Sequence, residues 1–269
     1  MERSFNETNI ITLKGIDQIY EADGKKNVVF DKLDFEIKDD NNTGQFVAIL
    51  GESGCGKSTI LRYIAGLQKP TAGTIEIYGK LQTSKDRIGM VFQQYSSLPW
   101  RTVLDNVMLP LELKGVPKAE SIDLAMQMIK LVGLEGHEKK YAQYPILSGG
   151  QLQRVALARS LVKRDKILLF DEPHGALDMR TKLEMDNLLV NIWDKLVIEE
   201  KQDPTFILVT HDVHEAVYLA DDIYIMSANP GRVTEWLHIN LPNRRNKEVK
   251  RSKEYLDYVS YIEDKMLIF

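Results

Sequence analysis

A glycine-rich loop over residues 51–59 contains the side chains with the clearest chemical role. Glycines let the backbone curl so that successive N–H groups face phosphate oxygens, and a following helix adds its positive end. Lys57 supplies a positive charge for the outer phosphates of a nucleoside triphosphate, and Ser58 supplies a hydroxyl for Mg²⁺. Cys55, at a variable position of this pattern, is interpreted as a small filler. The predicted triphosphate-binding residues are Gly51, Glu52, Ser53, Gly54, Cys55, Gly56, Lys57, Ser58 and Thr59.

An acidic pair, Asp171 and Glu172, follows the apolar run 167–170. A carboxylate at the C-terminal end of a parallel strand projects into the crevice where such sheets bind ligands. Asp171 is predicted to hold Mg²⁺ through water, because this cation dehydrates reluctantly. Glu172 is then placed to polarise an attacking water. The alternative is that both carboxylates merely cap the end of the strand.

Several short elements must position these groups. Residues 46–50 form an unbroken apolar run that leads through the loop into a helix over 58–67, which is typical of a buried parallel strand feeding a helix. Runs at 10–13, 28–30 and 33–37 alternate as antiparallel strands do, with a turn at Asp23-Gly24. Strands are also expected at 74–78 and 88–92.

Between 95 and 162 the strand pattern stops. Helical spacing is present at 103–109, 118–132 and 148–161, with breaks expected at Pro99, Pro110, Pro117 and Pro145. Strands then resume at 166–170, 205–209 and 222–226, with helices at 183–193 and 213–220 between them. The predicted fold class is α/β, a P-loop NTPase core with a mixed sheet, an N-terminal antiparallel β subdomain and an inserted α-helical subdomain.

The predicted domain covers 8–240, with the helical subdomain inserted at about 95–162, and a C-terminal tail covers 241–269. One helical face of the tail gathers apolar side chains, which favours a helix packed on the core, with a partner-binding helix as the alternative. Those side chains are Tyr255, Leu256, Val259, Ile262 and Met266.

Composition excludes several classes of protein. The chain has 269 residues, a net charge of −4 and one cysteine, so we expect no nucleic-acid partner and no internal disulfide. Its start lacks a secretory signal, and no apolar run is long enough for a membrane-spanning helix. The expected location is the cytosol, with any membrane role peripheral.

A pentapeptide over residues 147–151, Leu-Ser-Gly-Gly-Gln, narrows the class further. With the loop before it and the acidic pair after it, the chain resembles the ATP-binding cassette (ABC) family of ATPases over roughly residues 8–235. The resemblance implies a homodimer that hydrolyses ATP with Mg²⁺, each copy completing the ATP site of the other. The residues implied to contact the partner's ATP are Ser148, Gly149, Gly150, Gln151 and Asp178.

The resemblance also implies roles for residues outside the motifs above. Tyr20 stands where the family stacks an aromatic ring on adenine, although a core or surface tyrosine is the alternative. Gln93 matches a glutamine that contacts Mg²⁺ and the attacking water, and His211 a histidine that contacts the γ-phosphate. The implied catalytic residues are thus Glu172, His211 and Gln93, and the implied metal ligands Ser58, Gln93 and Asp171. His174 replaces a common phenylalanine and is expected to tune packing.

A softer resemblance concerns the branch of the family. The segments 98–106, with Trp100 and Arg101, 229–232 and 241–245 resemble the importers of nitrate, sulfonate, taurine and related small anions. That branch implies integral membrane permease subunits and an extracytoplasmic solute-binding protein, with no substrate contact by this subunit. Trp100 as a core residue is the alternative to a role at the permease. Other open functions are the ATPase of an exporter and an ABC ATPase that transports nothing.

Overall fold

The computed structural model describes residues 9–22, 24–39, 44–83, 86–94, 96–174, 178–241 and 245–267. These residues form two compact units. One comprises Met1–Ile88 together with Thr205–Phe269, and the other comprises Gly89–Pro204. The domain limits expected from the sequence stay a prediction.

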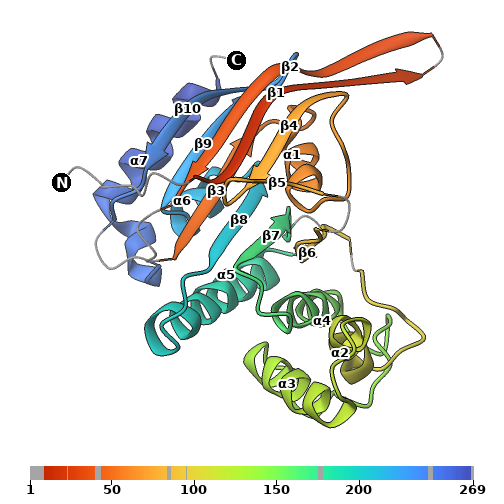
Figure 1. Ribbon diagram of the computed structural model, residues 1–269. Coiled ribbons are helices and arrows are strands. Elements are labelled where there is room, and N and C mark those ends of the chain that lie inside the picture. The colour runs from red at the N-terminus through yellow and green to blue at the C-terminus, as the bar shows by residue number, and fades with distance from the viewer. Residues whose placement is uncertain are drawn as a thin grey trace. The chain divides into compact units, whose positions relative to one another are not determined.

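An antiparallel sheet begins the first unit (Figure 1). Its strand order is β2-β1-β4-β5, formed by β1 (Asn9–Ala22), β2 (Lys25–Lys38), β4 (Ala72–Ile77) and β5 (Lys80–Leu81). The expected N-terminal antiparallel layer is confirmed. The runs 28–30 and 33–37 were expected as separate strands but lie on one strand. Between the two runs the pairing of β1 with β2 shifts register, at an irregularity that includes Lys32, whose φ is 51°.

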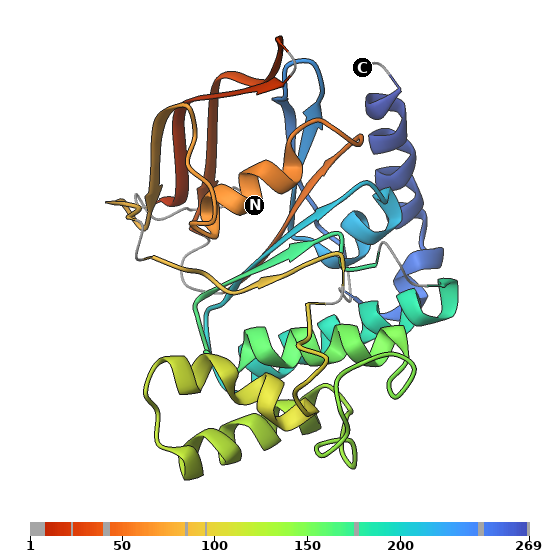
Figure 2. The ribbon, with the colours of Figure 1, turned by 90° about the vertical axis from the view of Figure 1, so that its right-hand side faces the viewer.

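A second sheet forms the core of the same unit. It contains β3 (Gln45–Gly51), β8 (Thr205–Thr210), β9 (Asp222–Ser227) and β10 (Arg232–His238), in the order β10-β9-β3-β8. β3 runs parallel to β8 and β9, and every residue of β3 and β8 is buried, as their unbroken apolar runs predict. The helix α1 (Lys57–Ile64) lies between the two sheets in Figure 2, and α6 (Val213–Leu219) packs against β3 and β8.

The C-terminal helix α7 (Lys253–Met266) follows a 3₁₀ turn, Lys247–Arg251. Tyr255, Val259 and Ile262 are buried, whereas Leu256 is 51% exposed, so α7 is a packed helix as the sequence favoured. The side chain of Arg245 anchors the start of the tail. It is buried, lies 3.1 Å from Asp221 as an ion pair and donates to the carbonyl of Leu219 at 2.8 Å.

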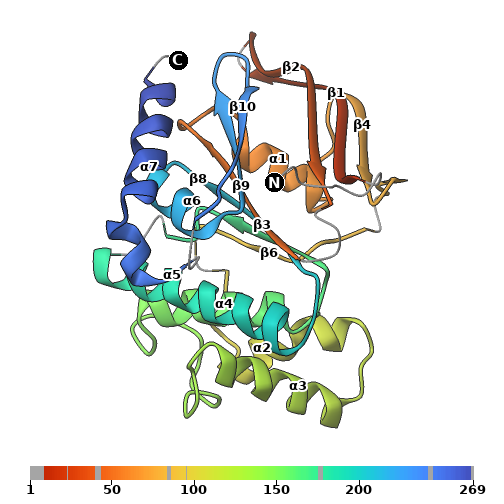
Figure 3. The same cartoon turned by 90° about the vertical axis from the view of Figure 1, so that its left-hand side faces the viewer.

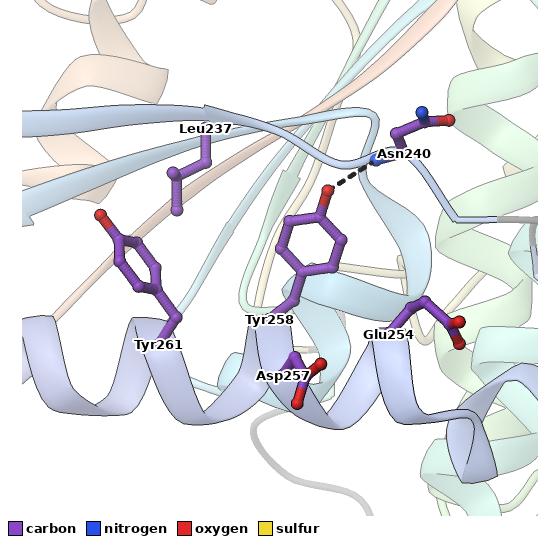
Figure 4. Close-up of a pocket in the computed structure, with 6 residues that line it drawn as sticks. All are labelled: Leu237, Asn240, Glu254, Asp257, Tyr258 and Tyr261. Carbon is purple, nitrogen blue, oxygen red and sulfur yellow. Dashed lines mark hydrogen bonds between the residues drawn. The ribbon is translucent and has the colours of Figure 1, made fainter.

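A groove of about 470 Å³ separates α7 from β10 (Figure 4). The ring of Tyr258 crosses it and its hydroxyl accepts from the N–H of Asn240 at 3.3 Å. Leu237 lines the strand side of the groove. This contact and the buried face of α7 hold the tail against the first unit.

The second unit combines a parallel strand pair with helices (Figure 3). β6 (Met90–Val91) pairs with β7 (Ile167–Asp171), and the helices are α2 (Val103–Leu113), α3 (Lys118–Leu131), α4 (Gly149–Leu161) and α5 (Met179–Asp194). A π-helical turn, Lys195–Glu199, extends α5. The predicted helical subdomain is thereby confirmed as part of the fold class. The break expected at Pro110 is wrong, because α2 loses one N–H there but continues for another turn, in which Leu111 is buried.

Within the described ranges, we found no helix both long enough and apolar enough to cross a lipid bilayer.

Candidate active site

The glycine-rich loop of the first unit connects β3 to α1. β3 ends at Gly51, α1 begins at Lys57, and Gly56 precedes the helix with a left-handed φ of 102°. The Lys57 ammonium donates to the backbone carbonyls of Gly51, at 2.7 Å, and Glu52, at 2.9 Å. The side chain therefore lies back across the loop, and Lys57 is 4% exposed. The succession of strand, loop and helix that the sequence predicted here is confirmed.

Residues distant in sequence support the loop from behind, and the sequence alone did not reveal them. A Cβ at Gly51 would lie 2.5 Å from the carbonyl oxygen of Met226, and a Cβ at Gly56 would collide with the ring of Phe30. A Cβ at Gly231 would collide with the carbonyl oxygen of Cys55. Gly231 belongs to the 229–232 segment that resembles the importers of small anions. The backbone of that turn therefore fixes one wall of the loop.

Two further residues of the first unit have environments that limit their roles. Cys55 is buried, and burial raises the pKa of its thiol, so the thiolate is disfavoured. This agrees with a small filler. Tyr20 is 40% exposed and its hydroxyl accepts from Gln68 Nε2 at 2.7 Å, which excludes the core alternative. The adenine-stacking role of Tyr20 stays a prediction.

His211 lies at the same sheet edge as the loop. β3 and β8 pair in parallel with Leu50 opposite Thr210, so the chain leaves both strands at their C-terminal ends. His211 directly follows Thr210 and is exposed. Asp212 then caps α6 by accepting from the N–H of Glu215 at 3.2 Å. Parallel pairing thus brings His211 and the loop to one edge of the sheet.

Parallel pairing does the same in the second unit. Val91 pairs with Phe170, so Gln93 and the acidic pair both lie at the C-terminal ends of β6 and β7, where Asp171 is the last residue of β7. Asp171 is 7% exposed. Glu172 has a φ of 43°, a left-handed conformation that costs free energy outside glycine and is found at functional sites. Gln93 is exposed.

The pentapeptide forms the start of α4 and closes a capping box. The N–H of Ser148 donates to Gln151 Oε1 at 2.9 Å, and the N–H of Gln151 donates to Ser148 Oγ at 3.3 Å. The first turn of a helix leaves four N–H groups without a helical acceptor, and this box uses two of them. The N–H groups of Gly149 and Gly150 have no acceptor among the residues that the structure describes. The N-terminal end of α4 can therefore offer two N–H groups to an anion.

The start of α5 lies against the same turn. A Cβ on Gly150 would come within 2.7 Å of Thr181 Cγ2, so only glycine fits there. The Thr181 hydroxyl and N–H both donate to the Asp178 carboxylate, at 2.7 and 3.1 Å. Both bonds lower the pKa of Asp178, and the bond from the Thr181 hydroxyl has the larger effect. Ser148, Gly149, Gly150, Gln151 and Asp178 thus belong to one local cluster, while 175–177 lie outside the described residues.

Comparison with known proteins decides the family. The sequence matches the ABC transporter family over residues 31–175, more than half of the chain. The chain belongs to the ABC transporter family. The nitrate import ATP-binding protein NrtD of Synechocystis is 45% identical over 80% of this chain and 81% of its own length. The taurine import ATP-binding protein TauB of Escherichia coli is 39% identical over 82% and 86%.

A solved structure supports the same assignment. The dimeric structure of MJ0796, a bacterial ABC transporter cassette, superposes with a TM-score of 0.72 at 33% identity, covering 86% of this chain and 99% of that one. The same cassette is also known in a dimeric post-hydrolysis state bound to ADP and Pi. This chain is accordingly an ATPase subunit of an ABC transporter, and its fold is the ABC cassette fold.

Several residues of the cassette can be tested for a fit to Mg²⁺. Ser58, Gln93 and Asp171 offer a hydroxyl, an amide and a carboxylate oxygen, the hard oxygen donors that this cation takes.

His174 is 5% exposed, and its Nε2 lies 3.5 Å from the Asp186 carboxylate on α5. That burial agrees with a packing role.

Proposed function

We propose that this subunit powers the uptake of a small solute through a separate membrane permease, with two copies of the chain working together. The similarity to the nitrate and taurine import proteins carries the proposal, because both relatives are importers and each covers about four fifths of this chain. A nitrate-, sulfonate- or taurine-like anion is the proposed class of solute. The subunit acts at the cytoplasmic face of the membrane, and an extracytoplasmic solute-binding protein delivers the solute.

In this proposal the loop and both strand edges act on one ATP. The backbone N–H groups over 51–59 and the Lys57 ammonium neutralise the β- and γ-phosphates. Glu172 accepts a proton from the attacking water and aligns it, while His211 donates to the γ-phosphate. Gln93 orients the same water. Mg²⁺, held by Ser58, Gln93 and Asp171, would offset charge on the phosphates.

The signature cluster, which comprises Ser148, Gly149, Gly150, Gln151 and Asp178, serves the second copy. Ser148 Oγ accepts from Gln151, so its own hydrogen is available to an anion, as are the N–H groups of Gly149 and Gly150. Such a helix start favours negative charge, which suits a γ-phosphate bound by the partner copy. Asp178, fixed beside this turn, belongs to the same contact.

Trp100 supports docking to the permease. It is 69% exposed, so the alternative of a core residue is wrong. Large exposed aromatics are frequent anchors of protein interfaces. We assign Trp100 to the surface that receives the permease.

The variant Glu172→Gln tests the catalytic assignment. The amide keeps the size of the side chain but cannot accept the proton of water, so ATP binding should persist while steady-state hydrolysis falls by at least about a hundredfold. Size-exclusion chromatography should then show an ATP-dependent dimer. Turnover near that of the wild type would contradict the role of Glu172.

Two observations separate import from the other functions. Co-purification with a membrane permease would exclude an ABC ATPase that transports nothing. Solute-dependent stimulation of ATP hydrolysis by a solute-binding protein, in vesicles that contain the complex, would exclude an exporter.

A further inference from the structure

His137 touches the signature cluster from the loop that precedes it. Its Nε2 lies 3.1 Å from Gln151 Nε2, and its Nδ1 lies 3.3 Å from the carbonyl oxygen of Glu135. A carbonyl oxygen can only accept, so Nδ1 carries the ring hydrogen and donates it to Glu135. Nε2 is then the ring acceptor, and it receives a hydrogen from the Gln151 amide.

The other end of the same amide is also committed. Gln151 Oε1 accepts from the N–H of Ser148 at 2.9 Å, which places the NH₂ group toward His137. Reversing the amide would set NH₂ against the N–H of Ser148 and oxygen against the lone pair of His137 Nε2. Both hydrogen bonds would be lost together. The ring therefore selects the amide orientation that closes the capping box.

We propose that His137 is a positioning residue for ATP hydrolysis, whose neutral ring holds the Gln151 amide and so keeps Ser148 in place. The inference rests on the proposed role of Ser148 at the partner's ATP. A closed box leaves the Ser148 hydroxyl hydrogen, and the glycine N–H groups, directed at the anion. With a freely rotating amide, the N–H of Ser148 loses its acceptor and the first turn of α4 loosens.

Protonation of the ring would reverse its effect. A charged imidazole donates from both nitrogens, so Nε2 would then oppose the NH₂ group, while turning the amide over would set NH₂ against the N–H of Ser148. The neutral Gln151 amide is the group that faces the ring from α4. On its own loop the neighbours are Glu135, Glu138, Lys139 and Lys140. Backbone N–H groups of Glu138 and Gly136 lower the pKa of Glu138, so its carboxylate stays charged. A charged ring would therefore lose the hold on the Gln151 amide that the neutral ring provides.

The first test compares His137→Phe with His137→Gln in the full chain. Phenylalanine keeps a planar ring but offers no acceptor, and kcat should fall about fivefold, the factor that a hydrogen bond of about 1 kcal/mol corresponds to. Glutamine places an oxygen near the position of Nε2 and should restore kcat. ATP affinity of the single subunit and the melting temperature should stay near wild type in both variants. Equal losses in both variants, in step with melting temperature, would assign His137 a purely structural role.

The second test reverses the direction of the hydrogen bond between residue 151 and His137. In Gln151→Glu, one carboxylate oxygen can still accept from Ser148, but the other requires a donor. The protonated ring supplies that donor and keeps its bond to Glu135, whereas the neutral ring can donate from Nε2 only by giving up the bond from Nδ1 to Glu135. Relative to wild type, this variant should gain activity toward acid pH, and adding His137→Phe should remove that gain. The same acid dependence in wild type, Gln151→Glu and the double variant would overturn the proposal.

Failure of this inference is distinguishable from failure of the proposed function. Ser148→Arg fills the anion position and should abolish hydrolysis while a single subunit still binds ATP. If Ser148→Arg remains active, the proposed role of the signature cluster is wrong. If Ser148→Arg is inactive but His137→Phe matches wild type at every pH, only the positioning role is wrong.

Discussion

At the scale of single residues, contacts between backbone atoms set the shape of the phosphate loop. Lys57 bonds to two carbonyls of its own loop, and Gly51, Gly56 and Gly231 leave no room for a Cβ. The motif predicted the lysine and the first two glycines, because their spacing encodes the loop. Gly231 escaped prediction, since it lies far along the chain and meets Cys55 only after β9 and β10 have formed.

Gly231→Ala should therefore weaken nucleotide binding without touching a phosphate ligand. No positive φ is needed at Gly231, so the alanine acts by displacing its neighbours, the Cys55 carbonyl and the Phe30 ring, and with them the loop. Because both displaced groups border the loop, we expect the Kd for ATP to rise about tenfold, which corresponds to about 1.4 kcal/mol. Titration with a fluorescent ATP analogue measures it.

Gly89→Ala is the matched control for that substitution. Gly89 also lacks a positive φ, and its nearest neighbour would be 3.5 Å from the added Cβ, an ordinary contact. Its Kd should equal that of the wild type. Equal Kd values for the two variants would show that Gly231 does not shape the loop.

At the scale of elements, the strands that are buried on both faces were the ones that the sequence predicted. The runs at 46–50, 167–170 and 205–209 were predicted because every residue of β3, β7 and β8 is buried and most of them are apolar. β10 was missed, since its residues alternate between half-buried and exposed and no apolar run marks it. The spacing of Ser148 and Gln151 indicates a capping box, but the contact of His137 with Gln151 depends on how the intervening loop folds.

The helix α7 allows a paired test of packing on one element. Ile262 is fully buried and Leu256 is 51% exposed, although both were assigned to one face in the sequence. Ile262→Ala should lower the free energy of unfolding by about 2–5 kcal/mol, because it removes buried methyl groups and leaves a cavity. Leu256→Ala should change it by less than about 0.5 kcal/mol.

Urea denaturation followed by circular dichroism measures both substitutions. If Leu256→Ala costs as much as Ile262→Ala, then Leu256 is buried in solution, and a partner-binding or self-associating face on α7 would regain support. The groove beside Tyr258 would be the surface to examine in that case (Figure 4).

At the scale of the whole molecule, we propose that each chain carries two half-sites that belong to different ATP molecules. The loop with Lys57 binds the chain's own ATP in our proposal, whereas Ser148 serves the ATP of the second copy. This division gives a prediction that no single-copy enzyme shares. Lys57→Ala and Ser148→Arg, each inactive alone, should complement each other when mixed.

The arithmetic of mixing follows from two-fold symmetry. In a mixed dimer, one site combines both lesions, while the other pairs an intact Lys57 with an intact Ser148. Random association of equal amounts makes about half of the dimers mixed, so about a quarter of all sites are complete. Steady-state ATP hydrolysis should recover toward that fraction if each site works independently, and it should scale with the product of the two concentrations. Activity that stays at the sum of the separate variants would show that each chain hydrolyses ATP with its own signature residues.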